Sequence, residues 1–241
     1  MESVSKKSSE NSVGRMFDRI APVYDKLNHI LSFGMDFFWR RRLAGLVVKE
    51  RKLRVIDLAT GTGDLLIALL QKNPNIEEIL GLDISEDMLA ICRKKLTRYH
   101  LTKHAKLICA DAHSSGLSDN AFDTVTMGFG IRNTPDVSKT LTEIFRLLKP
   151  GGETFILEFS MPQSRTLKFI YLLYLRYCVP FIGRVISGNN EAYRYLNTSI
   201  EKFFNVEAFL SLMQKSGFEN ITAFPLTFGI VCIYKGSKIV K

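Results

Sequence analysis

The stretch VIDLATGTGD, residues 55–64, decides the fold. An apolar run reaches Asp57, two glycines follow one residue apart at Gly61 and Gly63, and a helical pattern begins at once. Glycine lets a backbone turn sharply and approach a ligand closely, and the free N–H groups at a helix start point toward that ligand. The stretch therefore predicts a strand, a tight turn and a helix that together hold a small polar ligand.

Two further residues narrow the choice of ligand. A dinucleotide fingerprint places a third small residue where this chain has Leu66, so a pyrophosphate is disfavoured. Asp83 ends the next predicted strand, where a carboxylate can accept hydrogen bonds from both hydroxyls of a ribose. The spacing favours a nucleoside-type ligand without phosphates. The simpler alternative is a strand-to-helix turn that binds nothing.

Strand and helix patterns alternate over most of the chain. Alternation of this kind predicts an α/β fold of the Rossmann-like type, with a mostly parallel, twisted sheet and helices on both faces. Helical patterns also precede the first strand and interrupt the chain before the last two strands. We expect strands at 55–59, 79–83, 106–111, 122–129, 153–159, 220–226 and 229–235, with a turn at 149–152.

Composition indicates the cellular compartment of the protein and the classes of partner that it can attract. The net charge is +9, from 33 Lys and Arg against 24 Asp and Glu, which attracts anionic partners without choosing among nucleic acid, lipid and metabolite. The sequence contains neither an uncharged apolar run of about 18 residues nor the apolar core of a secretory signal, so we expect a bacterial cytoplasmic protein. The four cysteines lack C-x-x-C spacing, which predicts reduced, buried thiols and no metal.

Polar residues that follow the predicted strands are the candidate site, because ligands of such sheets lie over the carboxyl ends of the strands. Asp111 can accept from an exocyclic amine such as that of adenine, and Ala112 leaves room for a flat ring. A carboxylate such as Asp57 also suits a sulfonium group. This set favours S-adenosylmethionine over NAD or ATP. Asp111 could instead be only a helix cap.

The chain resembles class I S-adenosylmethionine-dependent methyltransferases and, more closely, the ubiquinone/menaquinone biosynthesis C-methyltransferase family. The resemblance spans roughly residues 14–236. Motifs typical of that family are FDRIAPVYDKLNHILSFGMDFFWRRRL, FDTVTMGFGIRNTPD and SGNNEAYRYLNTSIEKF, whereas LATGTGD, GLDISEDML and LLKPGG occur in many methyltransferases.

The resemblance implies a set of cofactor-binding residues, which are Asp57, Gly61, Thr62, Gly63, Asp83, Asp111, Ala112 and Gly128. Two positions depart from the pattern. Ala59 stands where many methyltransferases have a further glycine, and Gly128 stands where some relatives have a serine that contacts the cofactor. A backbone group at Gly128 could replace the serine contact.

The reaction that the resemblance implies is methyl transfer to a ring carbon of a polyprenylated quinol. A quinol hydroxyl has a pKa of about 10 by analogy with tyrosine, so its proton must be removed or its anion stabilised. The resemblance implies that Arg132, Asn133 and Tyr24 are the catalytic residues. Arginine is too basic to act as a simple base, so we expect Arg132 to order a water or stabilise the oxyanion while Asn133 and Tyr24 orient the ring. His113 is the competing base. Alternatively, Arg132 is a surface or salt-bridging arginine, and Tyr24 is an aromatic that only packs its helix.

Residues 166–186 are apolar but interrupted by charges and a proline, which favours a lid or a membrane-facing surface over a spanning helix. A core helix or a homodimer interface is the alternative. We expect a disordered tail at 1–12 and one methyltransferase domain at 13–241, with an N-terminal helical substrate-site segment at 14–48 and a helical insertion at 164–200.

The favoured substrate is demethylmenaquinol, in menaquinone biosynthesis. A ubiquinone-pathway methoxy-benzoquinol, or use of both quinols, is the alternative. An RNA methyltransferase or an inactive scaffold is more distant, and no nucleic-acid partner is expected. We also expect peripheral contact with the membrane surface.

Overall fold

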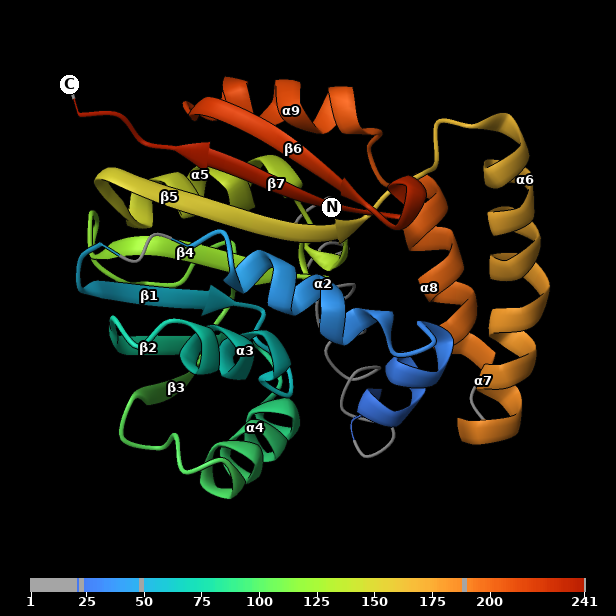
Figure 1. Cartoon of the computed structure of the whole chain (residues 1–241), viewed down its shortest axis with the longest axis horizontal. Coiled ribbons are helices and arrows are strands. Elements are labelled where there is room, and N and C mark those ends of the chain that lie inside the picture. The colour runs from blue at the N-terminus through green and yellow to red at the C-terminus, as the bar shows by residue number, and fades with distance from the viewer. Residues whose placement is uncertain (1–20, 22–23, 48–49, 188–189, 241) are drawn as a thin grey trace, which may run out of the picture.

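The computed structural model describes residues 21, 24–47, 50–187 and 190–240. Its centre is a seven-stranded sheet in the order β3-β2-β1-β4-β5-β7-β6 (Figure 1). Only β7 runs antiparallel to its neighbours, β5 and β6. The strands are β1 (Leu53–Leu58), β2 (Ile76–Asp83), β3 (Ala105–Cys109), β4 (Phe122–Gly128), β5 (Leu148–Phe159), β6 (Glu219–Leu226) and β7 (Val231–Ser237). The predicted α/β fold with a mostly parallel sheet is confirmed.

Helices cover both faces of this sheet because successive strand residues point to opposite sides. On one face, α2 (Met35–Ala44), α3 (Asp64–Lys72) and α4 (Glu86–Arg98) form a core with Val55 and Phe155. On the other face, α5 (Val137–Leu147) and α9 (Val206–Lys215) form a core with Ile56 and Ile156.

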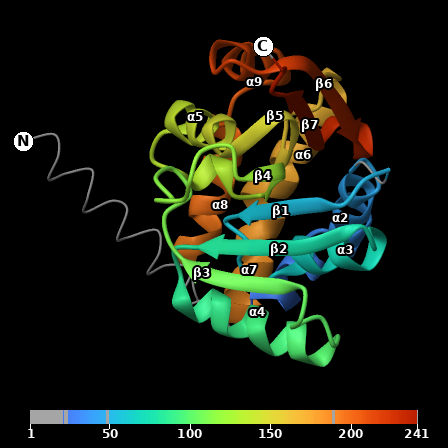
Figure 2. The same cartoon turned by 90° about the vertical axis from the view of Figure 1, so that its left-hand side faces the viewer.

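A third apolar cluster lies beyond the carboxyl ends of the parallel strands. It joins Leu27, on a helical stretch at 24–31, to Tyr171, Leu175, Val179 and Ile200. The last four belong to α6 (Arg165–Leu173), a π-helical turn (Tyr174–Cys178), α7 (Val179–Ser187) and α8 (Asn190–Lys202). Figure 2, turned by 90°, shows α6, α7 and α8 behind the sheet. The N-terminal helical segment and the helical insertion thus meet beyond the carboxyl ends of the parallel strands.

Two local expectations are wrong. The predicted turn at 149–152 lies inside β5, where the pairing with β4 jumps from Leu148 to Glu153 while β4 advances only from Phe122 to Thr124. A bulge absorbs the extra residues, and Gly151 adopts φ 78° within it. The cysteines also differ from expectation, since Cys109 and Cys178 are exposed whereas Cys92 and Cys232 are buried. The tail at 1–12 lies outside the described residues.

Candidate active site

The glycine loop between β1 and α3 has the conformation that its sequence demands. Ala59, Gly61 and Gly63 adopt positive φ angles of 50°, 56° and 86°. A Cβ added at Gly63 would lie 2.3 Å from Cys92 Sγ, whereas a Cβ added at Gly61 would meet open space. Gly63 is therefore fixed by close packing on α4, and Gly61 borders a space that a ligand can enter.

Asp83 fixes this loop from the end of β2. Its Oδ2 accepts a hydrogen bond from the Gly61 N–H at 2.8 Å, and its Oδ1 accepts from the Ser85 N–H at 2.9 Å. Each carboxylate oxygen can accept more than one hydrogen bond. Asp83 is thus suited to the ribose role that its spacing predicts.

Asp57 supports the loop from below. Its two oxygens accept from the hydroxyls of Thr60 at 2.7 Å and Thr126 at 2.6 Å, and the residue is 1% exposed. Burial raises its pKa to about 6, and the nearby carboxylate of Asp83 adds to the rise. Asp57 therefore holds residues of the loop and of β4 and adds negative charge beside the loop.

The side chain of Thr62 turns toward the N-terminal helix. Its hydroxyl donates to Asp25 Oδ1 at 2.6 Å and accepts from Lys95 Nζ at 3.0 Å. Lys95 also pairs at 2.5 Å with Asp25 and at 2.5 Å with Asp64. This network ties the helix that carries Tyr24 to the predicted cofactor loop.

Asp111, Ala112 and His113 lie together just past β3. Asp111 Oδ1 accepts from the His113 N–H at 3.0 Å and lies 2.6 Å from His113 Nδ1. Ala112 is buried in the core beside α5 and β4. At the end of β4, a Cβ added at Gly128 would lie 3.0 Å from Leu65 Cδ2, so the backbone of this residue comes close to α3.

These groups fit S-adenosylmethionine better than a phosphate-bearing cofactor. The acceptors near the loop are the carboxylates of Asp57 and Asp83, which suit hydroxyls and a sulfonium and repel phosphate. The cations closest to the loop, Lys95 and Arg40, are held in ion pairs with Asp25, Asp64 and Asp36. The assignment of individual residues to the cofactor stays a prediction.

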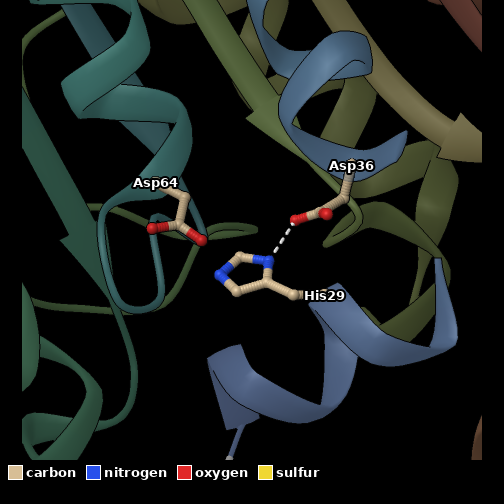
Figure 3. Close-up of side chains that lie close together, drawn as sticks. All are labelled: His29, Asp36 and Asp64. Carbon is tan, nitrogen blue, oxygen red and sulfur yellow. Dashed lines mark hydrogen bonds and ion pairs between the residues drawn. The ribbon is translucent and has the colours of Figure 1, made fainter. Parts of the chain in front are cut away.

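A group of possible metal ligands, His29, Asp36 and Asp64, lies beside this network (Figure 3). The His29 Nδ1 is 2.7 Å from Asp36 Oδ2, with which Arg40 also pairs, and Arg40 lies 3.9 Å from Asp64. The guanidinium already supplies the positive charge that the two carboxylates require. The cluster therefore joins the 24–31 helix, α2 and α3, and it gives no argument for a metal.

The predicted catalytic residues Tyr24, Arg132 and Asn133 come together on one cavity of about 390 Å³. His113, the competing base, is absent from the lining of this cavity. Most of the wall is apolar and comes from the N-terminal segment, the helical insertion and the loop before β7, with Leu27, Leu31, Phe33, Trp39, Phe129, Phe159, Ile170, Leu175, Val179, Ile200 and Phe228 among its members.

Arg132 is buried in an ion pair. Its side chain is 6% exposed, and its Nη1 donates at 2.7 Å to Glu158 Oε1 and at 2.7 Å to the Phe129 carbonyl. Glu158 is fully buried, and burial raises its pKa although Arg132 opposes the rise. Arg132 is therefore salt-bridged, as one form of the alternative expects, but it does not lie on the surface.

Hydrogen bonds position Asn133, and burial determines the protonation state of Tyr24. Asn133 Nδ2 donates to the Phe129 carbonyl at 3.3 Å, and Asn133 Oδ1 accepts from the Tyr195 hydroxyl at 3.3 Å. Burial raises the pKa of Tyr24, against the nearby charge of Arg132. Tyr24 therefore remains a neutral hydroxyl at physiological pH.

Sequence reasoning gave no role to Glu158, Tyr171 and Tyr195. Glu158 lies near the carboxyl end of the fifth predicted strand, where site residues are expected, and Tyr195 lies in the family-typical segment SGNNEAYRYLNTSIEKF, so both had a signal. Tyr171 lies in an apolar run whose pattern fits a core helix as well as a lid. Only the folded structure shows that it lines the cavity.

Known proteins resemble this chain over nearly its whole length. The family model described as the ubiE/COQ5 methyltransferase family matches residues 5–238. A demethylmenaquinone methyltransferase of Thermus thermophilus is 43% identical over 92% of this chain and 100% of its own length. A demethylmenaquinone methyltransferase of Thermotoga maritima is 42% identical over 93% of this chain and 95% of its own length.

Solved structures share the fold. The cyclase SpnF has a TM-score of 0.71 at 18% identity, covering 96% of this chain and 97% of its own. A SAM-dependent methyltransferase from Thermotoga maritima, described as a possible histamine N-methyltransferase, has a TM-score of 0.64 at 20% identity, covering 94% and 99%. The fold is that of class I methyltransferases, and the chain belongs to the ubiE/COQ5 methyltransferase family.

Proposed function

We propose that this enzyme transfers a methyl group from S-adenosyl-L-methionine to a ring carbon of demethylmenaquinol. The observation that carries the proposal is the convergence of Tyr24, Arg132 and Asn133 on an apolar cavity. A flat ring with a prenyl tail matches a mostly apolar wall that has a few polar groups. The names of the two relatives described above favour the naphthoquinol over a ubiquinone-pathway benzoquinol.

The chemistry that the residues must support is carbon alkylation. The bound cofactor supplies an electrophilic methyl group on a sulfonium and leaves as a neutral thioether. A quinol hydroxyl gives its proton to water, the ring carbon beside it forms the new C–C bond as the bond between sulfur and the methyl carbon breaks, and the hydrogen on that carbon then leaves to water as a proton. One proton is released overall, because the proton that the oxygen gave up is regained when the ring becomes a quinol again.

Each residue at the cavity has a role in this chemistry. The buried charge of Arg132 favours the quinol oxyanion in an environment of low dielectric constant. Glu158 holds the guanidinium in place through one nitrogen. Tyr24 and Asn133 orient the ring as neutral hydrogen-bonding groups. Catalysis thus rests on stabilising the anion, and neither an arginine base nor a metal is required.

The mouth of the cavity suggests how a lipid-soluble substrate enters. Phe33 and Phe228 line the cavity, yet each is 81% exposed. Phe169 and Phe181, on α6 and α7, are also largely exposed. Aromatic side chains exposed around an opening are suited to the interfacial region of a bilayer. We therefore propose that this end of the protein contacts the membrane surface. No helix among the described residues is long and apolar enough to cross a membrane.

A flotation assay tests the membrane contact. The double variant Phe33→Ser, Phe228→Ser should bind anionic liposomes several-fold more weakly than the wild type. Tyr99→Ser, which removes an exposed aromatic outside the cavity lining, should leave binding unchanged. Equal binding of all three proteins would contradict the assignment of this surface.

Methyl transfer to reduced demethylmenaquinol, followed with labelled cofactor in detergent, tests the reaction itself. Arg132→Ala should bind the cofactor normally and lose turnover. Full activity of that variant would remove Arg132 from the reaction.

A further inference from the structure

The polar groups on the wall of the cavity are mostly paired with one another. Tyr174 donates its hydroxyl hydrogen to the Leu31 carbonyl at 2.6 Å, and the Trp39 indole N–H donates to the Thr227 hydroxyl at 2.7 Å. The Tyr195 hydroxyl donates to Asn133 at 3.3 Å. Each of these donor hydrogens therefore has an acceptor within the protein.

Two buried groups on the same wall are exceptions. Among the described residues, the Nε of Arg132 and the hydroxyl of Tyr171 have no hydrogen-bond partner, although both atoms are shielded from solvent. Both residues line the cavity, and Tyr171 as a whole is 7% exposed. A buried donor without a partner is costly, so two such donors on residues that line one cavity indicate a ligand that accepts hydrogen bonds.

The chemistry of the pair specifies the kind of acceptor. The Arg132 Nε carries a hydrogen and shares the cationic charge, and its Nη1 is already bonded to Glu158. Burial raises the pKa of Tyr171 well above its usual value, so its hydroxyl keeps its proton and can donate. The charge of Arg132 opposes this rise. Two donors, one of them charged, suit a single anionic oxygen.

We infer that Tyr171 is a substrate-binding residue, whose hydroxyl joins the Arg132 Nε–H in holding the oxyanion of the quinol during methyl transfer. This inference rests on the proposed function and adds a residue to it. It also gives α6 a chemical role, because the helix that carries Tyr171 closes over the ring and contributes a donor to it.

The test compares two tyrosines that differ in position. Tyr171→Phe removes the hydroxyl and keeps the ring in the third apolar cluster. Tyr234→Phe removes a buried hydroxyl on β7, which lies outside the cavity lining, and serves as the matched control. Purified proteins are assayed with labelled S-adenosylmethionine and reduced demethylmenaquinol across a range of pH, and cofactor binding is measured by calorimetry.

Loss of one donor to an oxyanion should lower kcat/KM for the quinol by about 10- to 100-fold in Tyr171→Phe. Cofactor affinity should not change. The rising limb of the pH–rate profile should also move to higher pH, because the bound quinol becomes harder to ionise. Tyr234→Phe should retain the wild-type rate and profile.

A Tyr171→Phe enzyme with the wild-type rate and pH profile would overturn the inference. So would a rate loss with an unmoved pH profile, because that result indicates a packing defect. Failure of the wild-type enzyme itself to methylate the quinol, with the cofactor bound, would instead contradict the proposed function. The two failures are therefore distinguishable.

Discussion

Replacing Glu158 with glutamine removes the charge that compensates Arg132 while it keeps the shape of the side chain. The carboxylate is fully buried, lies 2.7 Å from Arg132 Nη1, and also accepts from the Phe159 N–H at 2.8 Å. Breaking a buried ion pair by removing one partner costs about 3–5 kcal/mol. Because domains of this kind are stable by about 5–15 kcal/mol, we expect the loss to be a large fraction of the free energy of unfolding.

A double-mutant cycle isolates the pair from other effects. Urea unfolding is measured for Glu158→Gln, for Arg132→Met and for the double variant. If the two charges depend on each other, the double variant should be more stable than the sum of the single losses predicts, by about 2 kcal/mol or more. If the losses of the two single variants add up to the loss of the double variant within about 0.5 kcal/mol, the two charges do not depend on each other. Glu158→Gln should also bind the cofactor normally and turn over slowly, because the guanidinium loses its anchor.

Three further predictions concern the cofactor loop. Asp83→Ala should weaken cofactor binding about 100-fold or more, through loss of charge-assisted hydrogen bonds, whereas calorimetry of exposed Asp87→Ala should match the wild type. The pKa of Asp57 is raised from 3.8 to about 6, so its contribution to stability is present below pH 3.8 and lost as pH rises through 6. The free energy of unfolding of the wild type should therefore fall by about 3 kcal/mol relative to that of Asp57→Asn between pH 4 and pH 8. If urea unfolding gives the two proteins the same dependence of this free energy on pH, the prediction is wrong. Lys95→Met should weaken cofactor binding about tenfold and increase proteolysis within 24–31, because Lys95 joins that helix to Thr62. If neither proteolysis nor cofactor affinity changes, the network does not connect the 24–31 helix to the cofactor loop.

Local sequence signals predicted the sheet and the loops at its carboxyl edge. Two glycines around Thr62 fixed the turn, and Asp83 at the end of its strand is bonded to that turn as the spacing suggests. The bulge in β5 was missed because Lys149–Gly152 has the composition of a turn, and only pairing with β4 shows that the strand continues through it.

The details of the cavity could not be predicted in the same way. The pair of Arg132 and Glu158 joins residues 26 positions apart, and nothing local distinguishes a buried guanidinium from an exposed one. Tyr171 reaches the cavity only because the helical insertion folds back over the N-terminal segment. Contacts of this kind depend on tertiary packing, which hydrophobic periodicity does not encode.

The proposed function is tested most directly by methyl transfer from labelled S-adenosylmethionine to reduced demethylmenaquinol by the purified wild-type enzyme, with the reduced ubiquinone precursor tested in parallel. We expect C-methylation of the naphthoquinol, and methylation of both quinols would make the enzyme dual in use. Methylation of neither quinol by a folded protein that binds the cofactor would contradict the proposed function.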